Sequence, residues 1–492
     1  MKKSKLFLVM SIFLVVFIIG CTEKVSEEEL AKELDNLTEE ELNYVLLEDA
    51  KSVAGQAYQF SQKEFPNLER LRKNVKPLKI SCSDSDGGVN YKEAGFVTLF
   101  NYPGGAIKKY DKCWADGKRL QEYVCEKGKY KGDYTFDCSS FGENYWCSEN
   151  KCVERVEFLI IAPSALQEGA ERLAEIRRSE GISTFVQNIE ALDINEDPNL
   201  LLNWLINFKN NNPALKYLLL FGNNGFIPTF YSENPAADLE TITDFKYSLP
   251  QDNLPTLAIG RIPVRDNLQA QRWVNKVEAY KNYIPDNDVF LYGYTAEYDA
   301  YAEINKDEIE SYGLTVSTYK PESTSSVADD ILNEAAPFIA SEINNGKKFS
   351  IFYGHGSSFI FHPVFHIPHI SLLSNKDKPT IVFTGGCDTV NYATEVPGIA
   401  EEFLIGENGA VAVVGATREG GYGFDYRFIP DFFKNCRNSS RLGDAFSLAV
   451  HENYDLTLSE DIWTGDANQQ DWANYFVERM TLLGDPTTPV CS

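Results

Sequence analysis

A histidine and a cysteine each stand among glycines directly after a strand-like apolar segment. The first segment leads into Gly354-His355-Gly356-Ser357, and the second leads into Gly385-Gly386-Cys387-Asp388. An imidazole beside a thiol can accept its proton and so make the sulfur a nucleophile. Glycines allow sharp turns and close approach of a substrate, and the amides of Gly356 and Cys387 can stabilise an acyl oxyanion. The pattern predicts an acyl-transfer site.

Neither residue carries this prediction alone. A single cysteine at a strand end is more often a buried thiol, and a single loop histidine is more often structural. The prediction comes from the pair, because consecutive strands of an α/β sheet are usually neighbours and ligands bind at their carboxyl ends. We therefore expect His355 to act as the general base and Cys387 as the nucleophile.

The segments that must position this pair alternate between apolar strands and amphipathic helices. The alternation predicts an α/β fold with parallel sheets covered by helices on both faces. We divide this region into two subdomains, residues 154–288 and 289–492, and the second contains the His-Cys pair. Strands are expected at 156–162, 183–187, 217–221, 257–262, 289–294, 314–319, 349–353, 380–384, 410–414 and 479–483, and helices at 166–178, 200–209 and 268–283.

The N-terminus has the features of an export signal. A lysine-rich start is followed by an apolar run from Leu6 to Ile19 and then by Gly20-Cys21. This order predicts a secretory signal peptide over residues 1–20 with a lipobox, so that Cys21 would carry a lipid; an uncleaved signal anchor is the alternative. The chain would then lie at the outer face of the cell membrane, anchored there or secreted. Residues 21–77 are acidic with helically spaced leucines, which indicates a stalk or an inhibitory prosegment.

Six cysteines crowd into residues 78–153, a segment whose turn residues and aromatic strands indicate a small β-rich module. In an exported chain such a group predicts three disulfides, with fifteen possible pairings. Zinc is disfavoured because the segment has no Cys-x-x-Cys pair and no histidine. The cysteines concerned are Cys82, Cys113, Cys125, Cys138, Cys147 and Cys152.

The same module contains a partial match to an EF-hand calcium loop. The first place of that loop is Cys82, and a thiol is a poor calcium ligand. We therefore favour a structural turn over a calcium site. The matching residues are Asp84, Asp86, Gly87, Asn90 and Glu93.

Charge and histidine spacing limit the partners further. The chain has 72 acidic and 46 basic residues and a formal net charge of −26, which disfavours nucleic acid as a partner. His362, His366 and His369 have a spacing suited to metal binding on a helix, but Pro363 and Pro368 interrupt any helix there. We assign no residue as a metal ligand.

The motifs around the His-Cys pair resemble the gingipain family of cysteine peptidases, peptidase family C25, which shares the caspase-like fold. The resemblance runs from about residue 156 to the C-terminus and leaves out the stalk and the cysteine-rich module. The motifs that carry it are 220–222, 227–228, 252–264, 354–357, 386–388, 409–412, 415–417 and 482–487.

The resemblance implies roles for individual residues. His355 is the general base, Cys387 the nucleophile, and the amides of Gly356 and Cys387 form the oxyanion hole. Asp252 aligns with an acidic side chain that reaches a basic P1 residue, and a turn-capping role is its alternative. Tyr422 stands where the family places an aromatic wall of the specificity pocket. A carboxylate that orients the histidine is expected near Asp244.

These observations predict a membrane-tethered extracellular cysteine endopeptidase that acts on proteins or peptides, with a leaning toward basic P1 residues. No cofactor is required for the chemistry, while the resemblance allows structural calcium. Two alternatives stay open. One is a catalytically silent surface-binding protein on the same fold, and the other is a transpeptidase, since the acyl-enzyme is common to hydrolysis and aminolysis.

Overall fold

The computed structural model describes residues 81–492 apart from short gaps. The expected signal peptide, the lipidation site Cys21 and the stalk therefore lie outside the described residues. No helix among the described residues is both long and apolar enough to cross a membrane. The chain divides after Glu154 into two compact units. The gaps are 103–104, 143–144, 149, 193, 195, 234–239, 252–253, 284–287, 294–295, 320–328, 362–363, 419–423, 460–468 and 491–492.

The first unit is a module of three small antiparallel sheets, β1-β2-β3, β4-β5-β6 and β7-β8. Its strands are β1 (Ser81–Asp84), β2 (Phe96–Tyr102), β3 (Gly105–Tyr110), β4 (Lys112–Cys113), β5 (Arg119–Glu126), β6 (Lys129–Asp137), β7 (Tyr145–Ser148) and β8 (Lys151–Glu154). The prediction of a small β-rich module is confirmed.

Three disulfides hold this module together. They join Cys82 to Cys125, Cys113 to Cys147 and Cys138 to Cys152. All six clustered cysteines are therefore paired, as the sequence predicts. The apolar core around them is small, so the cross-links contribute stability mainly by restricting the unfolded chain.

The second unit contains a ten-stranded, mostly parallel sheet, in the order β10-β9-β11-β14-β23-β22-β21-β17-β15-β16. All ten strands lie within a few residues of the positions expected from the apolar runs. Their bounds are β9 (Phe158–Ala162), β10 (Thr184–Asn188), β11 (Tyr217–Phe221), β14 (Ala258–Ile262), β15 (Asp288–Gly293), β16 (Thr315–Tyr319), β17 (Phe349–Tyr353), β21 (Thr380–Thr384), β22 (Ala410–Ala416) and β23 (Met480–Gly484).

One sheet runs through both expected subdomains. The C-terminal strand β23 lies between β14 of the first half and β22 of the second, and it pairs antiparallel with β22. The two halves are thus joined by backbone pairing at the centre of the sheet. Two short sheets of the described residues in this unit lie outside it. They are the hairpin β12 (Phe230–Glu233) and β13 (Glu240–Thr243), and the triplet β18 (Gly356–Ser357), β19 (Ile360–Phe361) and β20 (Phe365–His366).

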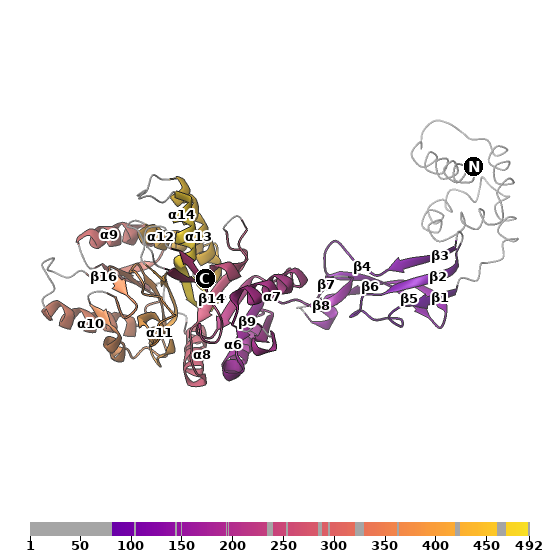
Figure 1. Ribbon diagram of the computed structural model, residues 1–492, viewed down its shortest axis with the longest axis horizontal. Coiled ribbons are helices and arrows are strands. Elements are labelled where there is room, and N and C mark those ends of the chain that lie inside the picture. The colour runs from indigo at the N-terminus through magenta and orange to yellow at the C-terminus, as the bar shows by residue number, and fades with distance from the viewer. Residues whose placement is uncertain are drawn as a thin grey trace, which may run out of the picture. The chain divides into compact units, whose positions relative to one another are not determined.

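Helices cover both faces of the sheet. Figure 1 shows α6 (Gln167–Ser179), α8 (Asn267–Asn282), α10 (Asp329–Asn344) and α11 (Ile399–Ile405) along one side, and α9 (Ala296–Ser311), α12 (Phe424–Cys436), α13 (Leu442–Ser459) and α14 (Gln469–Arg479) along the other. The alternation of side chains in β9 explains this. Phe158 and Ile160 belong to the large core with α6 and α8, whereas Leu159 and Ile161 pack with α7 (Pro198–Asn211).

The junction between β14 and β23 requires glycine. A Cβ atom added to Gly260 would lie 2.1 Å from the carbonyl oxygen of Gly484 and 3.1 Å from Cδ of Pro486. Backbone atoms cannot swing aside as a flexible side chain can. The close approach of the two strands, and with it the continuity of the sheet, therefore depends on the missing side chain at Gly260.

We predict that Gly260→Ala lowers the free energy of unfolding by about 2–3 kcal/mol, because the added methyl group must push β14 away from β23. Urea denaturation of the full chain measures this. Gly225→Ala is the matched control, since the closest atom to its added Cβ is 3.5 Å away on the Asn223 side chain. If Gly260→Ala lowers the free energy of unfolding no more than Gly225→Ala does, the close approach of β14 and β23 does not require glycine at position 260.

Candidate active site

The register between two adjacent strands brings the predicted dyad to one place. β17 and β21 are parallel neighbours, and the last pair of the ladder is Phe352 opposite Thr384. Gly385 N then donates a hydrogen bond to Phe352 O at 2.9 Å, which extends the ladder. His355 and Cys387 each stand three residues beyond the last pair. The two side chains therefore leave the same edge of the sheet at matched positions.

The two loops also touch through their backbones. A Cβ added to Gly356 would lie 3.0 Å from Cα of Gly386, 3.0 Å from O of Cys387 and 2.4 Å from Cγ2 of Thr389. A Cβ added to Gly386 would meet Cα of Gly356 at 3.0 Å. Both glycines are thus needed for the histidine loop to lie on the cysteine loop. The glycines that predict the site from sequence serve here as close-contact residues.

Both reactive side chains are accessible to a substrate. His355 is exposed and Cys387 is partly exposed, while the strand residues before them are buried. The Cys387 thiol takes no part in a disulfide. An accessible imidazole and an accessible thiol on a rigid sheet edge meet the first requirement for covalent chemistry on a polypeptide.

Hydroxyl groups hold the turn that carries Cys387. Thr389 Oγ1 donates to Gly386 O at 2.9 Å, and Thr384 Oγ1 donates to Thr389 Oγ1 at 3.2 Å while it accepts from Gly386 N at 3.2 Å. Asp388 has a φ of 62°, in the left-handed region that side chains other than glycine rarely adopt. The chain therefore reverses just after Cys387, and two buried threonines fix the reversal.

The histidine loop is held from its other side by a helix N-terminus. Ile399 N, at the start of α11, donates to Ser358 O at 2.7 Å. Gly398 N donates to the carboxylate of Glu401 at 2.8 Å, and Arg265 pairs with the same carboxylate at 3.1 Å. The loop from 354 to 358 is thus fixed between α11 and the cysteine loop, so the position of His355 is set by backbone contacts.

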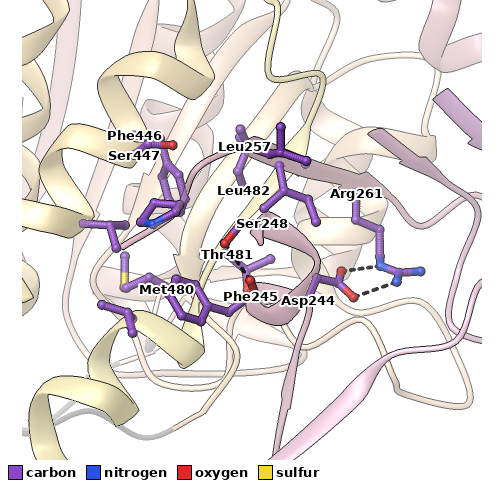
Figure 2. A pocket seen from close by; sticks show the side chains of 15 residues that line it. Asp244, Phe245, Ser248, Leu257, Arg261, Phe446, Ser447, Met480, Thr481 and Leu482 are labelled. Atoms are coloured by element: carbon purple, nitrogen blue, oxygen red, sulfur yellow. Dashed lines mark hydrogen bonds and ion pairs between the residues drawn. The ribbon is translucent and has the colours of Figure 1, made fainter. Parts of the chain in front are cut away.

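The turn after β13 carries an acidic residue, Asp244, that forms a buried ion pair with Arg261. Asp244 follows β13, and its carboxylate accepts two hydrogen bonds from Arg261, from Nε at 2.6 Å and from Nη2 at 2.7 Å. Figure 2 shows this side-on pair, with the Asp244 carboxylate facing the guanidinium. Arg261 is fully buried and also donates to the carbonyls of Gly222 and Ile227. The pair ties the turn after β13 to strand β14.

The Asp244–Arg261 pair is connected to the cysteine loop by contacts with Tyr392. Thr229 Oγ1 lies 3.1 Å from Asp244 Oδ1 and 2.8 Å from the Tyr392 hydroxyl, and the Arg261 guanidinium lies over the Tyr392 ring at 4.9 Å. Burial raises the pKa of Tyr392, and the Asp244 charge adds to the rise. Burial alone would lower the pKa of Arg261, but the attraction of Asp244 outweighs it and the net shift is upward. Tyr392 therefore stays neutral and Arg261 stays charged.

The cavity drawn in Figure 2 does not suit a substrate. It lies beside Asp244 and Arg261 and is lined mostly by apolar residues, together with Ser248, Ser447 and Thr481. Its volume is about 30 Å³, which is room for about two water molecules.

The other site residues expected from sequence have mixed outcomes. Asp252 and Tyr422 lie outside the described residues, so their roles stay predictions, as does the orienting role of Asp244. His362 is also outside them. His369 accepts a hydrogen bond from His366 N at 3.0 Å through Nδ1, which gives that nitrogen a local structural role.

An arginine that the sequence does not single out also lies at the site. Arg418, two residues beyond the end of β22, forms an ion pair with Asp388 at 3.6 Å, and its Nε donates to Glu240 O at 2.9 Å. It thus joins the residue after the candidate nucleophile to the β12-β13 hairpin. A charged residue just after a buried strand is the only sequence signal for it, and that signal is weak.

Comparisons with known proteins show the family and the fold. The family model for Peptidase family C25 matches residues 153–491. No curated protein gives a match. Similar solved structures include a protease (TM-score 0.58, 17% identity), the Arg-specific cysteine proteinase gingipain R (0.57, 14%) and the complex of Porphyromonas gingivalis RgpB pro- and mature domains (0.56, 15%). Each covers 68% of this chain, and the chain covers 78–79% of each. At these identities the likeness shows the fold.

We predict that Asp244→Asn lowers the free energy of unfolding by about 3 kcal/mol or more, because it leaves the buried Arg261 guanidinium without a countercharge. Chemical denaturation of the full chain measures the loss. Glu278→Gln is the control, since its ion pair with Arg172 at 2.5 Å is close but has side chains 40% and 49% exposed. That variant should lose at most about 1 kcal/mol. Similar losses in the two variants would show that the buried Asp244–Arg261 pair stabilises the fold no more than the exposed Arg172–Glu278 pair does.

Proposed function

The chain belongs to peptidase family C25, a family of cysteine peptidases, and from this premise we propose that it is an endopeptidase that cleaves proteins through Cys387 and His355. The observation that carries the proposal is the matched position of these residues beyond the Phe352–Thr384 pair, together with the backbone contact of their loops. A peptidase family supports proteins or peptides as substrates.

The proposed reaction has two halves. In the first, His355 takes the proton of the Cys387 thiol, the sulfur attacks the carbonyl carbon of the scissile bond, and the oxyanion is stabilised by the amides of Gly356 and Cys387. The carbon–nitrogen bond then breaks, and His355 returns the proton to the leaving amine. In the second half, His355 takes a proton from water and the oxygen of that water attacks the thioester carbon. The carbon–sulfur bond then breaks, and His355 returns its proton to the Cys387 sulfur as the new carboxylic acid leaves.

The rigidity of the site supports this role. The cysteine turn is held by Thr384 and Thr389, and the histidine loop is held by the amide of Ile399. Fixed backbone amides suit oxyanion stabilisation because no reorganisation is needed during the reaction. A polypeptide can reach the site because His355 and Cys387 lie at an open sheet edge.

The location and the substrate preference belong to the same proposal. We infer an exported protein, anchored by lipid at Cys21 or secreted, and the three disulfides support an oxidising compartment. A leaning toward basic P1 residues rests on the acidic net charge of −26 and on Asp252. A transpeptidase would share the first half-reaction and differ only in the second nucleophile.

We predict that His355→Ala and Cys387→Ala each lower kcat/KM for peptide cleavage by at least about a thousandfold, because each removes one half of the nucleophile and base pair. Full-length protein is incubated with a peptide library, and the products are identified by mass spectrometry. Internal cleavage with water-derived carboxyl ends indicates an endopeptidase, whereas joined peptides indicate a transpeptidase.

His451→Ala is the control for this experiment, because His451 is a partly exposed residue of α13 that pairs with Asp455. It should cleave like the parent chain. Undiminished cleavage by Cys387→Ala would contradict the assignment, and no turnover by the parent chain would favour the catalytically silent binding protein.

We predict that Asp252→Asn lowers kcat/KM for substrates with Arg or Lys at P1 by about 10- to 100-fold relative to substrates with a neutral P1 residue, since a charge-assisted contact is lost. Matched fluorogenic peptides measure the ratio. Asp377→Asn, at an exposed carboxylate, should leave the ratio unchanged. A basic preference that survives in Asp252→Asn would remove this residue from the P1 site.

A further inference from the structure

Four carboxylates from separate segments converge in the disulfide module. Asp84 ends β1, Asp86 follows it, Asp111 lies between β3 and β4, and Glu122 lies within β5. One oxygen from each of Asp86, Asp111 and Glu122 lies within 4.8 Å of the others. The Asp84 carboxyl lies next to that of Asp86. Residues far apart in sequence thus form one acidic cluster.

Several oxygens of this cluster are buried without a hydrogen-bond partner. Glu122 is 0% exposed, and while its Oε1 accepts from Asn90 N at 2.8 Å, its Oε2 is buried and accepts nothing. Asp84 Oδ1 and Asp86 Oδ2 are buried and unpartnered in the same way. A buried carboxylate oxygen with no donor costs free energy unless something binds it.

Within the part of the chain that the structure describes, no lysine or arginine forms an ion pair with any of the four carboxylates. Three carboxylates whose oxygens lie within 4.8 Å of one another, with no cation paired to them among the described residues, call for a positive ligand.

The surrounding backbone holds the carboxylates in place. Asp111 accepts from Gly95 N at 2.7 Å and from Tyr123 N at 2.9 Å, and Asp84 Oδ2 accepts from Cys125 N at 2.8 Å. A Cβ added to Gly95 would lie 2.6 Å from Cγ of Asp86 and 2.7 Å from Oδ2 of Asp111. The missing side chain at Gly95 thus makes room for the convergence. Such outer contacts are typical of a preorganised ligand set.

We propose that Asp84, Asp86, Asp111 and Glu122 bind one calcium ion. Carboxylate oxygens alone suit a hard cation, and calcium accepts several of them in flexible geometry, whereas magnesium requires a near-octahedral set and retains water. Asp84 and Asp86 also belong to the EF-hand match, but the later residues of that match do not join the cluster, since Asn90 Nδ2 donates to Glu93 at 3.1 Å in an exposed position. Asp111 and Glu122 come from more distant segments of the chain. Loop spacing alone therefore does not indicate the complete site.

A calcium ion here would cross-link the module. β1 belongs to the sheet β1-β2-β3, and Glu122 belongs to the sheet β4-β5-β6. The Cys82–Cys125 disulfide joins the same two sheets beside the cluster. The ion would therefore act as a second, reversible cross-link next to a covalent one, and its binding would stabilise the folded module by mass action.

The experiment uses the full, oxidised chain after removal of metals with EDTA. Isothermal calorimetry with CaCl₂ counts binding sites, and hydrogen exchange over residues 84–126 reports binding within this module. We expect calcium to slow exchange in these peptides. Glu122→Gln should lose one binding site, or bind there at least about tenfold more weakly, because the charge of the ligand set falls. MgCl₂ at equal concentration should protect the peptides less.

Glu126→Gln is the matched control, since it makes the same change on the same strand at a side chain that is 61% exposed. It should bind calcium like the parent chain. Without calcium, Glu122→Gln should exchange no faster than the parent, because it relieves repulsion among buried carboxylates. This separates lost binding from a folding defect.

Unchanged exchange over residues 84–126 on addition of calcium to the parent chain would overturn the proposal. The same calcium-induced protection in Glu122→Gln would do so too. Equal protection by magnesium would overturn the choice of calcium.

Discussion

The candidate site depends above all on the parallel register between β17 and β21. Phe352 pairs with Thr384, and the chain then runs an equal distance on both strands to His355 and Cys387. Because side chains alternate between faces with a period of two, a slip of one residue would move buried side chains to the wrong face and separate the pair. The fully buried strands make such a slip costly, so the apolar core sets the position of the chemistry.

Contacts around this edge of the sheet connect the β17–β21 register to the rest of the second unit. Gly356 and Gly386 let the two loops meet, and Thr389 fixes the turn after Cys387. The first half of the unit contributes through Asp244 and Arg261, whose buried pair leads by way of Thr229 and Tyr392 into the cysteine loop. The ten strands therefore form one support, although the reactive residues come from adjacent strands near one end.

Local sequence patterns predict the elements of this fold well and their arrangement poorly. Runs such as 158–162 and 217–221 are apolar throughout, so both the strand and its burial can be inferred. The insertion of β23 between β14 and β22 depends on tertiary packing and leaves no local pattern. The same holds for the chosen disulfide pairing, for Arg418 beside Asp388, and for the convergence of Asp86, Asp111 and Glu122. Each of these features depends on contacts between residues far apart in the sequence, so no local sequence pattern indicates it.

If His355 activates the Cys387 thiol, the rate at which Cys387 is alkylated depends on His355. Full-length protein and His355→Gln are treated with iodoacetamide at about pH 7, below the usual thiol pKa, and the peptide with Cys387 is followed by mass spectrometry. We expect His355→Gln to react more slowly by about tenfold or more, because the thiol loses its base, while His451→Gln reacts like the parent. Equal rates for the parent and His355→Gln would show that His355 does not activate Cys387.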